Sequence, residues 1–345
     1  MNRYGYSVAI VGASGEVGKS MVETLERYPI PVTSLKLLAS SRSAGKSMVF
    51  KGQPLIIEEL TENSFDGIDL AFFSAGGSVS EKFAPIAVYK GAVVIDNTSA
   101  FRMHQDIPLV VPEVNADVLT HEMKLIANPN CSTIQLVVAL KPLMDVYGIE
   151  SVNVATYQAI SGAGAKALYE YNQELEQDDY VPQILPTRSD KVHYQMAHNV
   201  IPQIDVFMEN GYTKEEIKMI NETRKILSDS SLKVNATCAR VPVRYGHSVC
   251  ATVKLKGPVQ NRQEIMDLFK NSSDVVLYDE IESQKYPMAY YLAHHDDVYV
   301  GRIRKDLFED DVIHLWIVAD NILKGAALNS VQIAYYMHRH GLLGD

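Results

Sequence analysis

The sequence predicts an α/β protein in which a doubly wound parallel sheet comes first and a second, α+β domain follows. Three observations predict this arrangement. Short apolar runs alternate with helical patterns up to about residue 130, a glycine turn follows the first run, and longer strand patterns follow about residue 150. A chain of 345 residues is long enough for two domains. We therefore expect a first domain at 1–130 and a second at 131–321, with a C-terminal helix within 322–345 that returns to pack on the first domain.

Composition restricts the classes of protein to consider. The formal net charge of −10 argues against a nucleic-acid partner, and no apolar run approaches the roughly 18 residues that a membrane-spanning helix requires. Residues 1–6 lead directly into a strand without signal-peptide features, so we expect a cytoplasmic protein. Cys131, Cys238 and Cys250 are odd in number and widely spaced, which fits neither a disulfide framework nor a zinc site, and we expect no metal.

The run Ser7–Val11 has a strand pattern that ends at Gly12, and Gly15 and Gly18 follow before a helical pattern over Lys19–Glu26. Strand, glycine turn and helix in this order surround a pyrophosphate with backbone N–H groups and a helix N-terminus. The spacing G-x-x-G-x-x-G differs from the commoner G-x-G-x-x-G. The prediction therefore depends on the position of the turn directly after the first strand. We favour a Rossmann-type dinucleotide site; the alternative is a merely tight turn.

The loop after the second strand, predicted over Ser34–Ala39, indicates which dinucleotide binds. NAD enzymes commonly place an acidic residue there for the ribose 2′-hydroxyl, whereas NADP needs a cation for its 2′-phosphate. The loop Ser40–Gly45 contains Arg42 and no acid. NADP is therefore the predicted cofactor; the alternative is that Arg42 is a solvated loop residue.

Two further buried strands, Ile68–Ser74 and Ala92–Asp96, flank a helical pattern over Val79–Lys90. The first of them ends in Ala75-Gly76-Gly77, which a parallel sheet places at its carboxyl edge, beside the cofactor. This alternation completes the doubly wound pattern.

The stretch Asn128-Pro129-Asn130-Cys131 closes the first domain and precedes an apolar run, Gln135–Leu140. Pro129 disfavours a continued strand and Asn130 is a good N-cap, so a helix is predicted to begin at or just after Cys131. A helix N-terminus stabilises an anion, which favours the thiolate of Cys131 and suits the same N–H groups to a developing oxyanion. The alternative for a lone cysteine is a small buried apolar residue.

The second domain has paired strands and grouped helices. The strand pattern Val152–Ile160 ends in Ser161-Gly162-Ala163-Gly164, and Asp178–Asp205 is an ordered, proline-containing excursion with little periodicity. The other predicted elements are helices over Ala165–Gln177, Thr213–Leu227, Arg262–Asn271 and Asn321–His340, two long antiparallel strands over Val234–Val243 and Ser248–Lys256, and strands over Tyr299–Arg304 and Ile313–Val318. This grouping is typical of an α+β domain.

Several ordered blocks carry a family resemblance. They are Gly12–Gly18, Phe73–Gly77, Asp96–Arg102, Asn128–Thr133, Tyr157–Gly164, His193-Tyr194-Gln195, Arg240–Val243 with Gly246-His247-Ser248, and Asp320–Ala327. Through these blocks the chain resembles the bacterial, NADP-dependent members of the aspartate-β-semialdehyde dehydrogenase family. Glu16 is a departure, because a small residue usually stands at that position in the family.

The resemblance implies a role for each matching position. Cys131 matches the nucleophile and His247 the acid/base, a task that suits an imidazole. Gln158 matches the side chain that orients the bound intermediate. Arg240 matches the bidentate clamp on the substrate α-carboxylate, and Glu215 the partner of its ammonium group. The remaining matches are Arg102, Lys218 and Asn130 for phosphate, and Gly12, Ser14, Gly15, Glu16, Val17, Ser41, Arg42, Ala75, Gly76, Ser161, Gly162 and Asn321 for the cofactor.

The implied reaction is the NADPH-dependent reductive dephosphorylation of L-4-aspartyl phosphate to L-aspartate 4-semialdehyde through a cysteine thioester. This step serves the biosynthesis of lysine by way of diaminopimelate, and of threonine, methionine and isoleucine; the resemblance also implies a homodimer. The nearest rival is another phosphorylating aldehyde dehydrogenase, such as an N-acetyl-glutamyl-phosphate reductase or a glyceraldehyde-phosphate enzyme. Arg240 and Glu215 favour a free amino acid, because N-acetylation would remove the ammonium group. A non-catalytic NADP-binding regulator with Cys131 as a redox sensor would leave the carboxylate clamp and the phosphate pair unexplained.

Overall fold

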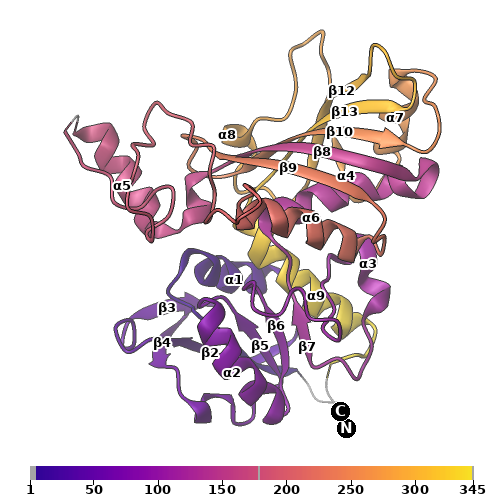
Figure 1. The fold of residues 1–345 in the computed structure, drawn as a ribbon. Helices are drawn as coiled ribbons and strands as arrows, with labels where there is room; N and C mark the ends of the chain where they lie inside the picture. Colours follow the sequence, from indigo (N-terminus) through magenta and orange to yellow (C-terminus); the bar gives the residue numbers. More distant parts are fainter. Residues whose placement is uncertain (1–4, 178, 344–345) are drawn as a thin grey trace. The chain divides into compact units, whose positions relative to one another are not determined.

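The computed structural model describes residues 5–177 and 179–343, and the chain divides into two compact units (Figure 1). Unit 1 contains the chain up to Asn130 together with the segment that starts at Ala326, and unit 2 runs from Cys131 to Gly325. Asp178, where the predicted excursion starts, and the last two residues of the predicted C-terminal segment lie outside the described residues. No helix in the described ranges is long and apolar enough to cross a membrane.

Unit 1 is built on a seven-stranded sheet in the order β3-β4-β2-β1-β5-β6-β7. All its strand pairs are parallel except β3 with β4. The chain moves outward from β1 to β2 and then returns to β5 on the other side, so the dinucleotide crevice of such a sheet falls at the carboxyl ends of β1 and β5. The elements are β1 (Tyr6–Val11), α1 (Glu16–Arg27), β2 (Val32–Ala39), β3 (Ser47–Phe50), β4 (Gln53–Glu59), β5 (Leu70–Phe73), α2 (Gly77–Tyr89), β6 (Val93–Asp96), α3 (Pro112–Asn115), β7 (Leu125–Ala127) and α9 (Leu328–Arg339).

Alternate residues of β1 pack into two different cores. Val8 and Ile10 face the core that contains side chains of α1 and α9, whereas Ala9 and Val11 face the core that contains side chains of α2. Strands that are buried on both faces lack polar alternation, which explains their continuous apolar sequences. The doubly wound class is confirmed, and α9 packs in unit 1 as expected (Figure 1).

The sequence does not predict β3, β4 and β7. β3 and β4 form a hairpin whose turn residues Lys51 and Gly52 both have positive φ, and the hairpin is largely exposed, so its side chains show little apolar alternation. β7 has only 3 residues. Strands this short or this polar give too little pattern to be recognised.

Unit 2 contains a six-stranded mixed sheet in the order β11-β12-β13-β10-β8-β9. α4 packs on β8, β10 and β13, and α6 packs on β9. Residues 132–140 of α4 are all buried, including the polar residues Ser132, Thr133 and Gln135, so this part of the helix is enclosed on every side. The α+β class of this unit is confirmed. Its elements are α4 (Cys131–Tyr147), β8 (Ile149–Gln158), α5 (Ala165–Glu176), α6 (Lys214–Ile226), β9 (Lys233–Arg240), β10 (His247–Leu255), α7 (Arg262–Lys270), β11 (Val276–Leu277), α8 (Ala289–Leu292), β12 (Tyr299–Lys305) and β13 (Val312–Ala319).

β9 and β10 run in opposite directions, as predicted, but they do not pair with each other. β8 lies between them, parallel to β9 and antiparallel to β10. The long connection from β8 to β9 includes α5 and α6, and a crossover of this kind is what a parallel neighbour requires.

The last helix is shorter than predicted. Asp320 Oδ1 accepts the backbone N–H groups of Ile322 and Leu323, both at 2.8 Å, and a π-helical turn over Leu323–Ala327 precedes α9. An aspartate that accepts these two N–H groups acts as an N-cap, so Asp320 sets where the helical segment starts, and the segment opens as a π-helical turn before it becomes α9.

α5 orders the excursion that follows it. Glu170 and Glu174 are buried, and their carboxylates accept the backbone N–H groups of residues 183–184 and 196–197 at 2.6 to 3.0 Å. A small apolar core that includes Leu185 and Ile201 packs against the same region. Buried carboxylates with backbone donors therefore stabilise a segment that has no helix or regular strand over 179–200.

Candidate active site

Cys131 is the first residue of α4, as predicted. Buried amides hold the stretch before it within unit 1. Asn128 Nδ2 donates to Asn97 Oδ1 at 2.9 Å, and Asn329 Nδ2 of α9 donates to Asn128 Oδ1 at 2.7 Å. The chain passes from this network directly into the helix, so the Cys131 sulfur lies at a helix N-terminus, where a thiolate is stabilised.

The Cys131 thiol pairs with His247, the first residue of β10. Cys131 Sγ lies 3.2 Å from His247 Nε2, and the backbone N–H of Ala159 donates to His247 Nδ1 at 3.0 Å. A backbone N–H is always a donor, so Nδ1 accepts and the neutral imidazole carries its proton on Nε2. His247 therefore presents an N–H to the sulfur. Burial and the nearby charge of Arg240 lower the pKa of His247 well below its ordinary value.

Three strand ends bring Gln158, Arg240 and His247 to one edge of the sheet. Gln158 ends β8 and lies in register with Arg240, which ends β9, while His247 begins β10 on the other side of β8. Their exposed fractions are 2%, 4% and 0%. The short segment between Arg240 and His247 passes the end of β8, which explains how a spacing of seven residues serves one site.

The Arg240 side chain has donors to spare. Its Nη1 donates to Ala159 O at 2.7 Å, and within the described residues this is the one hydrogen bond of its guanidinium. Burial lowers the pKa of Arg240, the charge of Glu215 opposes this effect, and a guanidinium stays charged in proteins. A buried planar cation with further N–H groups suits a carboxylate.

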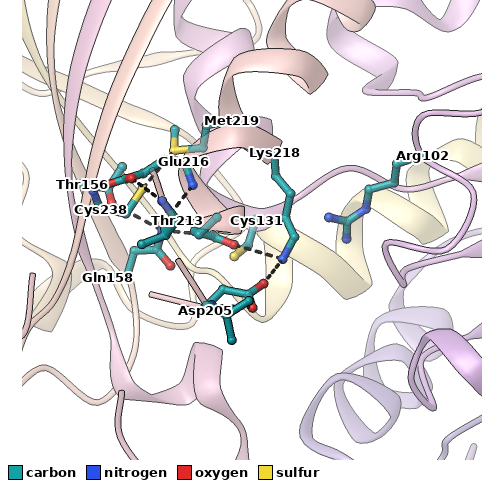
Figure 2. A network of polar contacts seen from close by, with 12 residues as sticks. Arg102, Cys131, Thr156, Gln158, Asp205, Thr213, Glu216, Lys218, Met219 and Cys238 are labelled. Carbon is teal, nitrogen blue, oxygen red and sulfur yellow. Dashed lines mark hydrogen bonds and ion pairs between the residues drawn. The ribbon is translucent and has the colours of Figure 1, made fainter. Parts of the chain in front are cut away.

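α6 contributes Glu215 and Lys218. Glu215 is buried, its Oε1 accepts Gln158 Nε2 at 3.1 Å, and its Oε2 lies 3.5 Å from Lys218 Nζ. Lys218 Nζ also donates to Asp205 Oδ2 at 2.7 Å (Figure 2). Glu215 therefore links Gln158, at the end of β8, to Lys218, and Lys218 in turn contacts Asp205.

Two glycines lie where any side chain would collide with these residues. A Cβ at Gly162 would lie 2.9 Å from Arg240 Nη1 and 3.3 Å from His247 Cε1. A Cβ at Gly325 would lie 2.8 Å from Cys131 Cβ. The contact at Gly325 involves Cβ and Cα of Cys131, so this approach requires glycine, whereas the contact at Gly162 is with the end of the Arg240 side chain.

Ser161 and Asn321, which match cofactor contacts, bond to each other. Asn321 Nδ2 donates to Ser161 Oγ at 3.0 Å, and Asn321 Oδ1 accepts the backbone N–H of Gly246 at 2.9 Å. Both side chains are buried. The pair therefore ties the turn after β8 to the turn before β10.

The glycine turn of unit 1 fits a dinucleotide phosphate. Gly12 has a φ of 88°, and a Cβ there would lie 2.8 Å from the carbonyl carbon of Ser74. Gly15 is the N-cap of α1, and among the residues that the structure describes no side chain caps this helix. The backbone N–H groups of Glu16 and Val17 in its first turn therefore have no side-chain acceptor, and such a helix N-terminus suits an anion.

The loop after β2 contacts the same turn, because Ser14 Oγ donates to Ser43 Oγ at 3.1 Å. Ser41 and Arg42 are exposed. Ala75 and Gly76, after β5, are exposed as well. These residues all follow the carboxyl ends of β1, β2 and β5, where the strand order predicts the crevice.

Arg102 and Asn130, which match the phosphate site, are both buried in unit 1. Arg102 Nε donates to Asn128 O at 2.9 Å, and its Nη2 donates to Asn97 O at 2.8 Å. Arg102 thus fixes the stretch that leads to Cys131.

The other two cysteines lie in different surroundings. Cys238 is fully buried against Met219, and burial raises the pKa of its thiol far above the ordinary value. Cys250 lies within β10, paired with Trp316 of β13. Cys131 is the cysteine that combines partial exposure with an imidazole N–H.

The sequence does not predict Asp205 or the role of Ala159. Asp205 ends an excursion without periodicity, so no pattern places it beside Lys218. The groups that Ala159 contributes are its backbone N–H and C=O, which any residue other than proline would offer. Gly325 belongs to a block that carries the family resemblance, yet its contact with Cys131 emerges only from the structure.

Two family models match the chain. Residues 7–122 match the semialdehyde dehydrogenase NAD binding domain, and residues 140–324 match the semialdehyde dehydrogenase dimerisation domain. The aspartate-semialdehyde dehydrogenase of Bacillus subtilis is 50% identical over 343 residues, which cover 98% of this chain and 99% of that protein.

Solved structures agree with these matches. Aspartate semialdehyde dehydrogenase II from Vibrio cholerae, complexed with ASA, has 45% identity and a TM-score of 0.91 over 98% of this chain and 99% of that one. Aspartate semialdehyde dehydrogenase with NADP from Candida albicans has 25% identity and a TM-score of 0.77 over 98% and 100%. The resemblance seen in the sequence is confirmed over both units: the chain belongs to the aspartate-semialdehyde dehydrogenase family.

Proposed function

We propose that the chain catalyses the NADP-dependent reductive dephosphorylation of L-4-aspartyl phosphate to L-aspartate 4-semialdehyde, and the reverse reaction. The observation that carries this proposal is the Cys131–His247 pair at the sheet edge that also holds the buried Arg240 guanidinium. Family membership supports the oxidoreductase class and argues against a non-catalytic regulator.

Cys131 is the nucleophile in this mechanism. Its thiolate attacks the acyl carbon of L-4-aspartyl phosphate, a carbon–sulfur bond forms, and the carbon–oxygen bond to the phosphate breaks with release of inorganic phosphate. The resulting thioester accepts hydride more readily than a carboxylate would, so one difficult step becomes two easier ones. When bound, the nicotinamide cofactor supplies the hydride that reduces the thioester carbon, and collapse of the thiohemiacetal then releases the aldehyde and the thiolate.

His247 acts as a donor at the sulfur. Its Nδ1 is occupied by the Ala159 N–H, so the proton on Nε2 faces Cys131 Sγ. This N–H stabilises the thiolate before attack and again when the thiohemiacetal collapses. The geometry supports the acid half of the acid/base role that the resemblance implies.

The residues around Arg240 suit a free amino acid as substrate. The spare donors of Arg240 would bind the α-carboxylate in a bidentate manner, and Glu215 would bind the ammonium group. Gln158, held by Glu215 at 3.1 Å, would orient the acyl oxygen without adding charge beside the thioester. Phosphate would be bound by Lys218, Arg102 and Asn130.

For the cofactor we propose NADP. The uncapped N-terminus of α1 and the close approach at Gly12 fit a pyrophosphate, and exposed Arg42 supports a 2′-phosphate. The residues that would hold NADP are Gly12, Ser14, Gly15, Glu16, Val17, Ser41, Arg42, Ala75, Gly76, Ser161, Gly162 and Asn321.

The test is the reduction of NADP by L-aspartate 4-semialdehyde with and without inorganic phosphate, repeated with NAD. We expect phosphate-dependent NADPH formation that Cys131→Ala abolishes while NADP binding stays unchanged. Cys250→Ala is the matched control and should retain activity. Trapping of an acyl adduct on Cys238 or Cys250 would contradict the proposal.

We also propose a homodimer formed through unit 2. This unit matches the dimerisation domain, and its sheet carries an apolar groove of ≈ 660 Å³ lined by residues such as Tyr157, Met288, Tyr290 and Trp316. An exposed apolar surface of this kind suits a second copy of the chain. Sedimentation analysis should show a dimer that Trp316→Glu weakens; a monomeric wild-type protein would exclude it.

A further inference from the structure

We propose that Asp205 is an internal counter-ion that competes with phosphate for Lys218 and so favours the release of phosphate from the site. This inference rests on the proposed function, in which Lys218 binds phosphate. It assigns a role in the reaction to a residue that neither the sequence pattern nor the family resemblance identified.

Lys218 forms an ion pair with a carboxylate from outside its own helix that is shorter than its ion pair with Glu215 of α6. Asp205 Oδ2 lies 2.7 Å from Lys218 Nζ (Figure 2). Glu215 Oε2, at i−3, lies 3.5 Å from the same nitrogen. The Asp205 and Lys218 side chains are 32% and 27% exposed, so solvent and a ligand can reach the pair. Burial raises the pKa of Asp205, but the hydrogen bond from Lys218 and the charge of Lys218 together outweigh this effect. The pKa of Asp205 therefore lies below its ordinary value. Asp205 is therefore ionised at neutral pH.

The fold aims this carboxylate at α6. Asp205 has a φ of 66°, a left-handed conformation that few side chains other than those of Asn and Asp adopt readily. The segment around it is fixed on both sides: Ile201 exchanges backbone hydrogen bonds with Arg240 at 3.0 and 2.8 Å, and Val206 O accepts the N–H of Lys214 at 2.9 Å. A chance surface ion pair between two long side chains has no such support.

Charges of both signs meet here before any substrate arrives. Arg240 and Lys218 are positive, Glu215 and Asp205 are negative, and Lys214 of α6 adds a further positive charge near Asp205. A phosphate dianion that binds Lys218 would bring its oxygens within a few Å of the Asp205 carboxylate, and like charges at such distances repel. Phosphate must therefore displace Asp205 or tolerate its repulsion. In the reductive direction phosphate is the leaving product, so a counter-ion that returns to Lys218 favours its departure.

The experiment measures the KM for inorganic phosphate in the oxidation of L-aspartate 4-semialdehyde by NADP, and inhibition of the reductive direction by inorganic phosphate. Asp205→Asn removes the charge and keeps the shape. We expect a phosphate KM roughly threefold to tenfold lower, stronger inhibition by phosphate in the reductive direction, and an unchanged KM for the semialdehyde. Asp205→Glu should remain close to wild type, and Asp205→Ser serves if the asparagine variant fails to fold.

Asp190→Asn is the matched control. Asp190 lies in the same excursion and accepts Gln203 Nε2 at 3.1 Å, the amide that also donates to Asp205 O. Its replacement removes the same charge without touching Lys218, so the phosphate KM should not change.

A phosphate KM that is unchanged or raised in Asp205→Asn would overturn the inference, because Asp205 would then be inert or would hold Lys218 in place for phosphate. A raised KM for the semialdehyde would overturn it too, because Asp205 would then bind the substrate ammonium. Lys218→Met distinguishes a failure of the proposed phosphate role of Lys218 from a failure of the counter-ion role of Asp205. If that variant leaves the phosphate KM unchanged, the phosphate role of Lys218 fails; if it raises the KM while Asp205→Asn does not lower it, the counter-ion alone fails.

Discussion

One added methyl group at Gly325 should displace Cys131, the proposed nucleophile, without altering its chemistry. Gly325 lies in the π-helical turn, and an added Cβ would lie 2.8 Å from Cys131 Cβ and 3.2 Å from its Cα, whereas ordinary contact begins at 3.4 Å. The shortfall at Cβ is therefore about 0.6 Å. The atoms involved belong to or adjoin the backbone, so no rotamer change relieves the contact, and the turn or the start of α4 must move.

A misplacement approaching 1 Å at an attacking atom lowers rates by roughly 10²-fold. We therefore expect Gly325→Ala to lower kcat by about tenfold to 100-fold, with a loss of about 1–3 kcal/mol in the free energy of unfolding from overpacking. NADP affinity should not change, because the N-terminus of α1 is untouched. The rate of Cys131 alkylation by iodoacetamide should fall with kcat, since His247 would no longer face the sulfur at the same distance.

Gly257→Ala is the control for this prediction. A Cβ at Gly257 would have nothing within 4 Å, and its backbone conformation is open to any residue. The control should keep kcat within about twofold of wild type. A folded Gly325→Ala protein with wild-type kcat and alkylation rate would refute the claim that this glycine sets the position of Cys131.

Three further predictions follow from the same geometry. Arg240→Lys should raise the KM for the semialdehyde by roughly tenfold to 100-fold in steady-state assays, because an ammonium group cannot bind a carboxylate in a bidentate manner; an unchanged KM would argue against the clamp. Arg42→Ala should raise the KM for NADP by roughly fivefold while the KM for NAD stays the same, and equal changes for both cofactors would exclude a 2′-phosphate contact. His247→Gln should flatten the pH dependence of stability in denaturant titrations. Burial and Arg240 hold the pKa of native His247 below the ordinary 6.5, so the unfolded chain binds the extra proton. The contribution of neutral His247 to the free energy of unfolding is fully present above about pH 6.5. Below that pH it falls in the wild type by at most about 1.4 kcal/mol per pH unit, and an equal slope in the variant would contradict this assignment.

Features that depend on neighbouring residues in the sequence are predictable from it. The helix start at Cys131 follows from a proline and an N-cap residue immediately before it, and α4 does begin there. The glycine turn likewise follows a strand and precedes a helix, and this order of elements is enough to place it at the carboxyl edge of the unit 1 sheet.

Features that depend on distant residues are not predictable in this way. The pairing of Gln158 with Arg240 requires that β9 join the sheet beside β8, and the sequence instead suggests a partner in β10. The tautomer of His247 depends on one backbone N–H, and backbone groups carry no sequence pattern. Asp205 reaches Lys218 only because the excursion returns to the edge of β9. In each case the information lies in tertiary contacts.

The positive side chains of the site offset locally the negative net charge of the chain. A chain with a formal net charge of −10 must attract a phosphorylated acid, so the positive charges that bind it have to be concentrated locally. Exposed lysines would be screened by salt, whereas Arg240 is 4% exposed and Lys218 is half-buried. Buried cations are costly without partners, and Glu215 and Asp205 meet this requirement before the substrate arrives. In the proposed function, phosphate takes the place of Asp205 at Lys218 while the substrate carboxylate binds the further N–H groups of Arg240, so phosphate release restores the Asp205–Lys218 ion pair.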